Sequence, residues 1–208
     1  MLLYFFVIIR KEFGIIEIHK KGMETVKVQD KTRFKLAKSM KELMKSKPLD
    51  KITVTDIVEN CDVSRQSFYR LFQDKYDLVN WYFEVLAQQS FKQMGVLYTL
   101  KEGLMKKFQF IEQEYVFFAQ AFASQDNNSL IHYDFECIYN FYKNLIETKN
   151  KAPLTSELSF LLEMYCHGSV SMTMEWIATD RKQAIETIVD LLIEALPDKL
   201  KEQLKELL

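Results

Sequence analysis

Residues 52–72 read ITVTDIVENCDVSRQSFYRLF, a stretch in which two short helical patterns are joined by a tight turn. Thr53 is a typical helix-capping residue, and Asp56 follows it at the three-residue spacing of a capping box. Asp62 occupies the turn, where its tolerance of a left-handed backbone is an advantage, and Ser64 caps the second helix. The stretch predicts a helix-turn-helix, a unit whose second helix enters the major groove of DNA.

In the second helix of this unit, the apolar and the polar side chains lie on different faces. Phe68 and Leu71 point inward, and the polar side chains that stay outside are Arg65, Gln66, Ser67, Tyr69 and Arg70. Exposed polar residues are common on any protein surface, so they carry no signal by themselves. On the second helix of a helix-turn-helix they become candidates for contact with DNA.

Helical patterns continue on both sides of the unit. Residues 31–47 form a helix with one apolar face, and its N-terminal part is expected to approach DNA phosphates. The basic residues of its opposite face are Lys31, Arg33, Lys35, Lys38, Lys41 and Lys45. Pro48 ends this helix. Asp74 caps a fourth helix that continues to about Met94 and joins a second core.

The composition favours an all-α fold. The 208 residues are 48% hydrophobic but include only 5 glycines and 3 prolines, so long helices are favoured over a fold with many turns. Residues 23–83 carry 12 Lys and Arg against 9 Asp and Glu, whereas residues 84–208 carry 12 against 18. The basic half is therefore the candidate for nucleic-acid binding, and the acidic half is expected to have a different partner.

No catalytic or metal-binding pattern emerges. Cys61, Cys137 and Cys166 are odd in number and widely separated, which indicates a reduced, cytoplasmic protein rather than a disulfide framework. The histidines lack metal-ligand spacing, and neither a phosphate-binding glycine loop nor a nucleophile elbow occurs. The sequence thus predicts a protein that is not an enzyme and uses neither a cofactor nor a metal.

Residues 1–22 differ from the rest of the chain. They open with the apolar run MLLYFFVII, which is too short for a bilayer span of about 20 residues and lacks the pattern of a signal peptide. Two interpretations remain open. The segment is either an additional interfacial or β-forming piece, or Met23 is the true start of translation, which is the interpretation that we favour.

Four motifs together resemble the N-terminal domain of TetR-type transcriptional regulators. They are ITVxDI at 52–57, VSR at 63–65, FYxxF at 68–72 and KxxL at 75–78, and the resemblance covers residues 37–81. The run FQDKYDLVNW at 72–81 is similar to a narrower branch that includes an activator of a dihydroxyacetone-kinase operon. Asp62 departs from the family, which usually has glycine there, and we expect a small cost in stability.

The resemblance implies a three-helix DNA-binding domain in residues 23–80 and a helical-bundle domain for sensing and dimerisation in residues 81–208. It places Arg65 and Gln66 at base edges, where each contact is worth about 1–3 kcal/mol of discrimination. The residues that it places at phosphates are Thr53, Thr55, Ser64, Tyr69 and Lys75, with Ser67 and Arg70 as further DNA-binding candidates. The free amides that begin the second helix are expected to assist Thr53 and Thr55.

The second half of the chain is helical, aromatic and acidic. Helical patterns cover residues 100–113, 115–122, 130–148, 154–178 and 181–196, and a short amphipathic helix is expected in 198–208. The candidates for contact with an inducer are Phe108, Phe118, Phe122, Tyr139, Tyr142, Glu163, His167 and Trp176. The alternative is that the aromatic residues belong to the hydrophobic core, and that Glu163 and His167 face a ligand or a dimer partner. The resemblance implies that the last two long helices form a four-helix dimer interface with the same helices of a second subunit. The small residues Gly168, Ser169 and Ser171 would allow the helices to approach closely there.

These observations predict a dimeric, cytoplasmic transcriptional regulator that binds double-stranded DNA, with no membrane association. Repression is the default of the family, and activation together with a protein co-activator is the alternative; the signal is an unidentified small-molecule inducer or that co-activator. Two other classes stay open. One is an architectural DNA-binding protein without an inducer, and the other is an all-α enzyme or adaptor in which the helix-turn-helix is incidental.

Overall fold

The computed structural model describes residues 28–179 and 181–207, and within these residues it contains helices but no β-strand. The α-helices are α1 (Val28–Met44), α2 (Val54–Asn60), α3 (Arg65–Tyr69), α4 (Lys75–Ala87), α5 (Leu100–Gln113), α6 (Tyr115–Ala123), α7 (Leu130–Asn150), α8 (Ser156–Ala178), α9 (Ile185–Glu194) and α10 (Asp198–Leu204). Two 3₁₀ turns are η1 (Leu49–Lys51) and η2 (Phe91–Gln93). The all-α fold is confirmed, and the predicted segment 1–22 lies outside the described residues.

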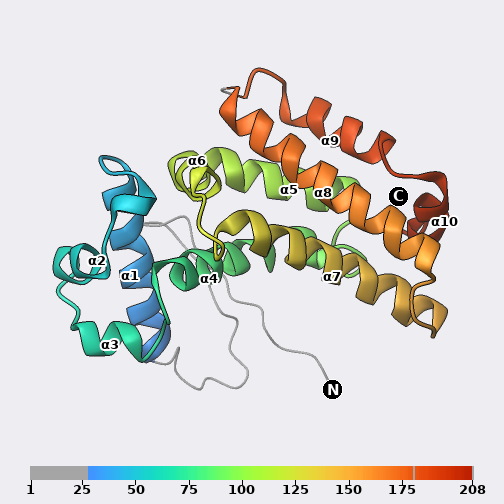
Figure 1. The fold of residues 1–208 in the computed structure, drawn as a ribbon. Coiled ribbons are helices and arrows are strands. Elements are labelled where there is room, and N and C mark those ends of the chain that lie inside the picture. Colours follow the sequence, from blue (N-terminus) through green and yellow to red (C-terminus); the bar gives the residue numbers. More distant parts are fainter. Residues whose placement is uncertain (1–27, 180, 208) are drawn as a thin grey trace.

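The helices fall into two groups (Figure 1). Helices α1, α2 and α3 form a small unit at one end of the molecule, and α5 to α10 form a larger bundle. Helix α4 starts in the small unit and runs along the bundle, so the predicted boundary at residue 80 falls inside a single helix. No helix in the described part of the chain is long and apolar enough to cross a membrane.

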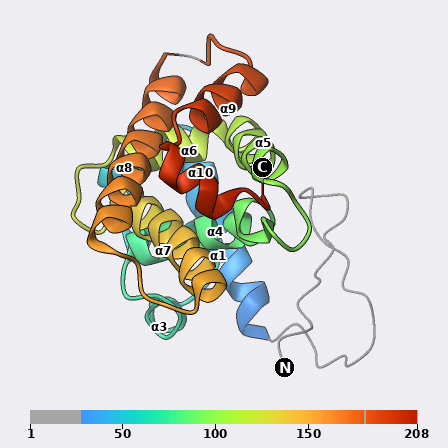
Figure 2. The ribbon, with the colours of Figure 1, turned by 90° about the vertical axis from the view of Figure 1, so that its right-hand side faces the viewer.

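The bundle is layered, as its end-on view shows (Figure 2). Helix α7 packs against α8, and α5 packs against α9. The buried Tyr165 hydroxyl of α8 donates to the Leu192 carbonyl of α9 at 3.0 Å, which ties these two helices together. Helix α10 closes the open end of the bundle with the buried Leu200 and Leu204, and the buried Leu207 follows directly after the helix.

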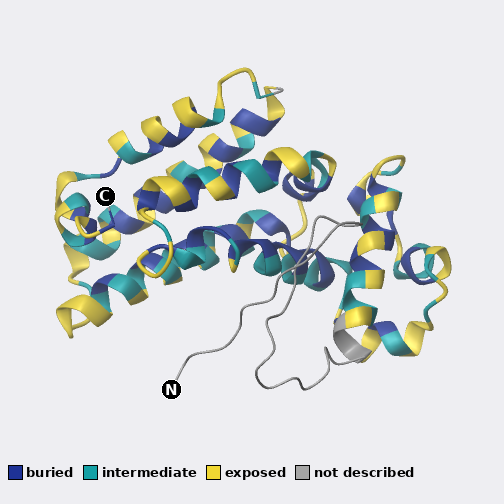
Figure 3. Cartoon of the chain, turned by 180° about the vertical axis from the view of Figure 1, so that it is seen from behind, coloured by how far each residue is buried: buried dark blue, intermediate teal, exposed yellow. Residues whose placement is uncertain are grey.

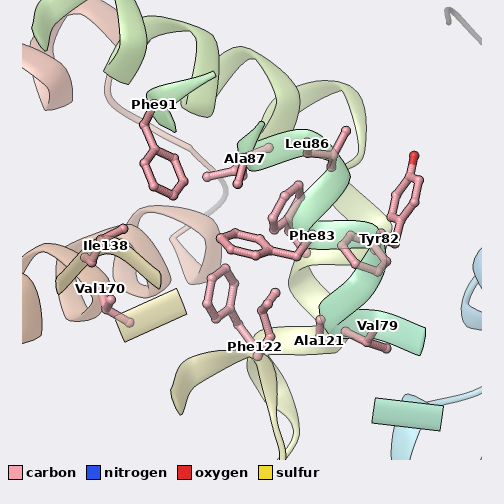
Figure 4. Packing of buried hydrophobic residues seen from close by; sticks show 14 of the residues in the cluster. Val79, Tyr82, Phe83, Leu86, Ala87, Phe91, Ala121, Phe122, Ile138 and Val170 are labelled. Carbon is pink, nitrogen blue, oxygen red and sulfur yellow. The ribbon is translucent and has the colours of Figure 1, made fainter. Parts of the chain in front are cut away.

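A continuous hydrophobic core joins the two groups. Phe83 of α4 lies between Phe91 of η2 and Phe122 of α6 in this core (Figure 4). Its ring forms a tilted pair with Phe91 and meets Phe118 of α6 edge to face, each at a centroid distance of 6.4 Å. Such aromatic pairs add about 0.5–1.5 kcal/mol each beyond the area that they bury. Helix α4 therefore packs both on α1 of the small unit and on α7 of the bundle.

Several helix boundaries differ from the sequence prediction, for example α1, which was predicted at 31–47, and two of the differences have a clear physical reason. Helix α4 ends at Ala87, not near Met94, because the Ser90 hydroxyl bonds back to the carbonyls of Leu86 and Ala87 and the chain tightens into η2. Helix α9 starts at Ile185, not at residue 181, because Arg181 has a φ of 56°, a left-handed conformation that stops a right-handed helix.

Candidate DNA-binding site

Helix α2 begins with a complete capping box. The Thr53 hydroxyl accepts from the Asp56 amide at 3.1 Å, and the Thr53 amide donates to the Asp56 carboxylate at 2.8 Å. Lys47 donates to the same carboxylate at 2.6 Å. This hydrogen bond from Lys47, together with the two from Thr53, lowers the pKa of Asp56 to about 2. The two threonines predicted at a phosphate, Thr53 and Thr55, are thus held at a well-ordered helix start.

This cap yields a prediction about pH. Because the pKa of Asp56 in the folded protein is below its ordinary value, the stabilisation that it provides is complete above about pH 4 and is lost as the pH falls through about 2. Replacing Lys47 with methionine should raise the pKa of Asp56 toward its ordinary value, as measured by NMR titration of the carboxyl carbon. Lys45→Met, a neighbouring exposed lysine, is the control and should leave this pKa where it is. An unchanged value in Lys47→Met would show that the threonine bonds alone set it.

The turn between α2 and α3 has the conformation that the sequence indicated. Asp62 has a φ of 49°, in the left-handed region, and the Val63 amide closes the turn on the Val58 carbonyl at 3.0 Å. Ser64 then caps α3 by accepting from the Ser67 amide at 3.1 Å. Aspartate, which tolerates the left-handed region better than most residues, therefore adopts at position 62 the conformation that glycine would take most easily.

Helix α3 is anchored by one buried side chain and is otherwise open to solvent (Figure 3). Phe68 is fully buried and contacts the rings of Tyr69 and Phe72, whereas Arg65, Gln66 and Arg70 are exposed. The Tyr69 side chain is 57% exposed. Among residues 28–179 and 181–207, no hydrogen bond or ion pair uses the side chains of Arg65, Gln66 and Arg70, so we expect them to be available to base edges and phosphates. Ser67 is only half-buried, but its hydroxyl already bonds to that of Ser64 at 2.9 Å.

Two members of the predicted basic face of α1 turn toward the protein. The guanidinium of Arg33 lies 5.9 Å from the ring centres of both Phe72 and Trp81. Lys41 donates to the Tyr82 hydroxyl at 2.8 Å and to the Glu114 carboxylate at 2.7 Å. The sequence pattern placed all six basic residues opposite the apolar face and did not indicate these protein partners of Arg33 and Lys41.

Lys75 also has partners within the protein. Its ammonium group donates to the carbonyl oxygens of Leu49, Asp50 and Ile52 at 2.8, 2.9 and 2.9 Å. Burial lowers the pKa of Lys75, against the opposing effect of nearby carboxylates led by Asp50. A phosphate contact, as the family resemblance implied, would require this lysine to give up at least one of these bonds.

The candidate inducer residues do not gather in one place. Phe108 and Tyr142 line a cavity of about 20 Å³, enough for about one water molecule. Phe118, Phe122 and Trp176 are buried in the aromatic core, and the Tyr139 hydroxyl bonds to that of Ser159 at 3.0 Å.

The two polar candidates, Glu163 and His167, are exposed on the outer face of α8, where the imidazole stacks on the Phe135 ring at a centroid distance of 3.9 Å. Neither of them reaches the cavity.

Lys107, which lines this cavity, belongs to a buried ion pair that was not predicted from the sequence. Lys107 of α5 donates to both carboxylate oxygens of Asp134 of α7 at 3.0 Å, with only 8% and 0% of their side chains exposed. A signal was present in the sequence. Lys107 lies on the helix face of Leu104 and Ile111, and Asp134 lies four residues from both Leu130 and Ile138. Two opposite charges on two apolar faces indicate a buried pair.

Comparisons with known proteins match two parts of this chain to models of protein families. Residues 39–80 match the model of the family "Bacterial regulatory proteins, tetR family", and residues 98–198 match that of a "Transcriptional regulator C-terminal region". A curated relative is the HTH-type dhaKLM operon transcriptional activator DhaS of Lactococcus lactis subsp. lactis (strain IL1403), which is 27% identical over 92 residues. That alignment covers 44% of this chain and 49% of the relative, so the chain matches about half the length of that protein.

A solved structure, titled Dihydroxyacetone kinase operon activator DhaS, has the same fold. It superposes with a TM-score of 0.56 at 22% identity, over 85% of this chain and 97% of that one.

Proposed function

The chain belongs to the TetR family of transcriptional regulators, and from that premise we propose that it binds an operator as a homodimer whose affinity is set by a signal received in residues 81–208. The observation that carries the proposal is the construction of α3, where a buried Phe68 fixes the helix and Arg65 and Gln66 are exposed, with no hydrogen bond or ion pair from their side chains to any residue that the structure describes. One such helix reads only a few base pairs, so pairing two of them is needed for useful specificity.

Selection of bound sequences from random DNA tests this proposal. We expect a palindromic site with two half-sites whose centres lie about one helical turn, or a multiple of it, apart. The affinity should fall steeply with salt concentration, because phosphate contacts release counterions. Enrichment of no sequence above background would contradict the proposal. Enrichment of many dispersed genomic sites, instead of a defined operator, would favour the architectural class.

Whether the protein represses or activates transcription is better judged from its relatives than from its fold. Repression is the default of the family, whereas both relatives carry names that describe an operon activator. We therefore propose activation as the second candidate function. A reporter gene behind the selected operator, measured with and without the protein, separates the two: higher expression in its absence indicates repression, and lower expression indicates activation.

The signal is proposed to act on the bundle of α5 to α10. Small-molecule pockets usually have volumes of roughly 300–1,000 Å³, so an inducer in the 20 Å³ cavity would have to separate α5, α7 and α8. A protein co-activator that binds the outside of the bundle needs no such opening. A small-molecule inducer should raise the melting temperature of the isolated protein, whereas a co-activator should do so only when the partner protein is added.

The dimer is proposed to form through the outer face of α8 and α9. Four apolar side chains are exposed there, Phe160, Met164, Met172 and Leu191, with exposures between 44% and 62%. Gly168 lies between the two methionines, and a Cβ atom at that position would meet nothing within 4 Å, so a partner helix can approach closely. Exposed apolar side chains that gather on one face mark an interaction surface.

Replacing Met164 with glutamate should weaken the dimer by a factor of about 100 or more. In a two-fold interface the substitution places two like charges close together and removes them from water, which costs several kcal/mol. Sedimentation velocity across a concentration series measures the change. Val96→Glu, at a loop residue that is 78% exposed and lies outside α8 and α9, is the matched control and should remain dimeric. A Met164→Glu protein that is as dimeric as wild type would indicate that the dimer interface lies on another face of the protein.

A further inference from the structure

The segment between α1 and α2 is held from two sides. This connector, residues 48–52, contains η1 and leads directly to Thr53, the capping residue of α2. On one side, the ammonium group of Lys75 donates to three of its carbonyls at 2.8–2.9 Å. An ammonium group has three donors, so these bonds use all of them. Lys75 is the first residue of α4, which makes this contact a direct link between α4 and the start of α2.

On the other side, the end of α6 reaches the same connector. The Gln120 side chain accepts from the Leu49 amide at 3.2 Å, and the Ser124 hydroxyl donates to the Asp50 carboxylate at 2.6 Å. The hydroxyl of Tyr76, on α4, donates to the same Asp50 oxygen at 3.1 Å. The bond from Ser124 is the largest cause of the lowered pKa of Asp50. The connector is thus bonded to α4 and to the end of α6 within the four residues 49–52.

We propose that Lys75 is a positioning residue that fixes the connector and, through it, the start of α2, instead of binding a DNA phosphate. We further propose that α6, which also packs against α1, acts on the start of α2 through this connector. The proposal rests on the proposed function and names the regulatory contact of that function. Helix α6 packs against α7 and α8, and α8 carries the proposed dimer face. A signal that shifts α6 therefore pulls on Leu49 and Asp50 and moves Thr53 with them.

Two substitutions of Lys75 separate positioning from phosphate binding. Lys75→Arg keeps the positive charge, but its planar guanidinium cannot donate to three converging carbonyls as a compact ammonium group does. We expect it to lose about tenfold in affinity for the selected DNA site, the equivalent of one charge-assisted hydrogen bond. Lys75→Met should lose affinity to a similar or greater extent while the slope of log affinity against log salt concentration stays that of wild type. A lost phosphate contact would instead reduce that slope by about 0.9 for each protomer.

The outcomes of this experiment are distinct. Wild-type affinity in Lys75→Arg, or a reduced salt slope in Lys75→Met, would overturn the positioning role and leave the proposed function intact. If the wild-type protein itself selects no DNA, the proposed function fails before either variant is made. Lys101→Met, which removes an exposed lysine of α5 that pairs with Asp190, is the control for a lost charge far from α1, α2 and α3. Circular dichroism and thermal unfolding establish that each variant is folded.

The coupling step has its own test. Combining Gln120→Ala with Ser124→Ala removes both bonds from the α6 side without touching α1, α2 or α3. Amide hydrogen exchange over residues 49–56 should become at least about tenfold faster, since opening of the connector then costs less, and exchange in α8 should remain unchanged. Ser129→Ala, at another buried serine of the same loop with no bond to the connector, is the matched control. Unchanged exchange in the double variant would overturn the role of α6.

Discussion

Replacing Arg65 and Gln66 together with alanine is expected to lower the affinity for the selected DNA site by a factor of about 30 to 10⁴ per half-site. A bidentate contact from arginine to guanine or from glutamine to adenine is worth about 1–3 kcal/mol, and two such contacts add when they read separate bases. Both side chains are exposed and bond to none of the residues that the structure describes, so the fold should be unaffected. Fluorescence anisotropy with the selected site and a scrambled duplex measures the loss.

The control variant removes a basic and an amide side chain at a site outside the helix-turn-helix. Lys182→Ala combined with Gln183→Ala removes a comparable pair of exposed side chains from the segment between α8 and α9, and should bind DNA as wild type does. The single variants should also relax specificity at different base pairs of the half-site, because each side chain reads its own base. Wild-type affinity in the Arg65 and Gln66 double variant would show that the helix-turn-helix is incidental, as in an adaptor or an enzyme.

The helix-turn-helix could be predicted from the sequence because its determinants are local. A cap connects residues that are two or three positions apart, as in Thr53 with Asp56 and Ser64 with Ser67, and Asp62 needs only its own backbone conformation. For the same reason the end of α4 was predicted less well, since it depends on how Ser90 bonds back to the last turn. No pattern in apolar spacing encodes that bond.

The roles of the lysines could not be predicted in this way. Periodicity indicates which face of a helix a lysine occupies, but its four-carbon side chain reaches partners that are distant in the chain. Lys41 finds Glu114, 73 residues further on, and Lys75 finds carbonyls 23 to 26 residues before it. The family resemblance placed Lys75 at DNA, and only the contacts of the folded chain suggest the alternative role.

The sensing half was predicted as helices but not as a site. Spacing identifies an aromatic stripe without showing which rings meet, so Phe108, Phe118 and Trp176 could be core or cavity lining with the same pattern. In the structure, Phe118 and Trp176 pack against other rings, at 5.1 Å from Phe117 and 5.2 Å from Phe108 respectively. The role of these residues in ligand binding stays a prediction, and the buried charges beside Phe108 are the feature of this region with the largest expected energetic effect.

Replacing Lys107 with methionine should destabilise the protein by about 3–5 kcal/mol, because it leaves the fully buried Asp134 carboxylate without its counter-charge. Asp134→Leu alone should cost about as much for the reciprocal reason. Combining the two should recover most of the loss, since a well-packed apolar pair is often as stable as a buried ion pair. Urea unfolding at neutral pH, with the cycle of two single variants and the double variant, measures the coupling.

The double variant also separates stability from signalling. Neither Lys107 nor Asp134 contacts α1, α2 or α3, so DNA affinity without a signal should equal that of wild type. If the response to the signal also survives, the pair serves only the packing of α5 against α7. Loss of the response in a double variant that folds and binds DNA normally would show that the signal acts through these two charges. Such a role would explain why a costly buried ion pair is present where an apolar pair would be as stable. Additive single-variant losses, with no recovery in the double variant, would contradict the argument that the unpaired charge is what destabilises the fold.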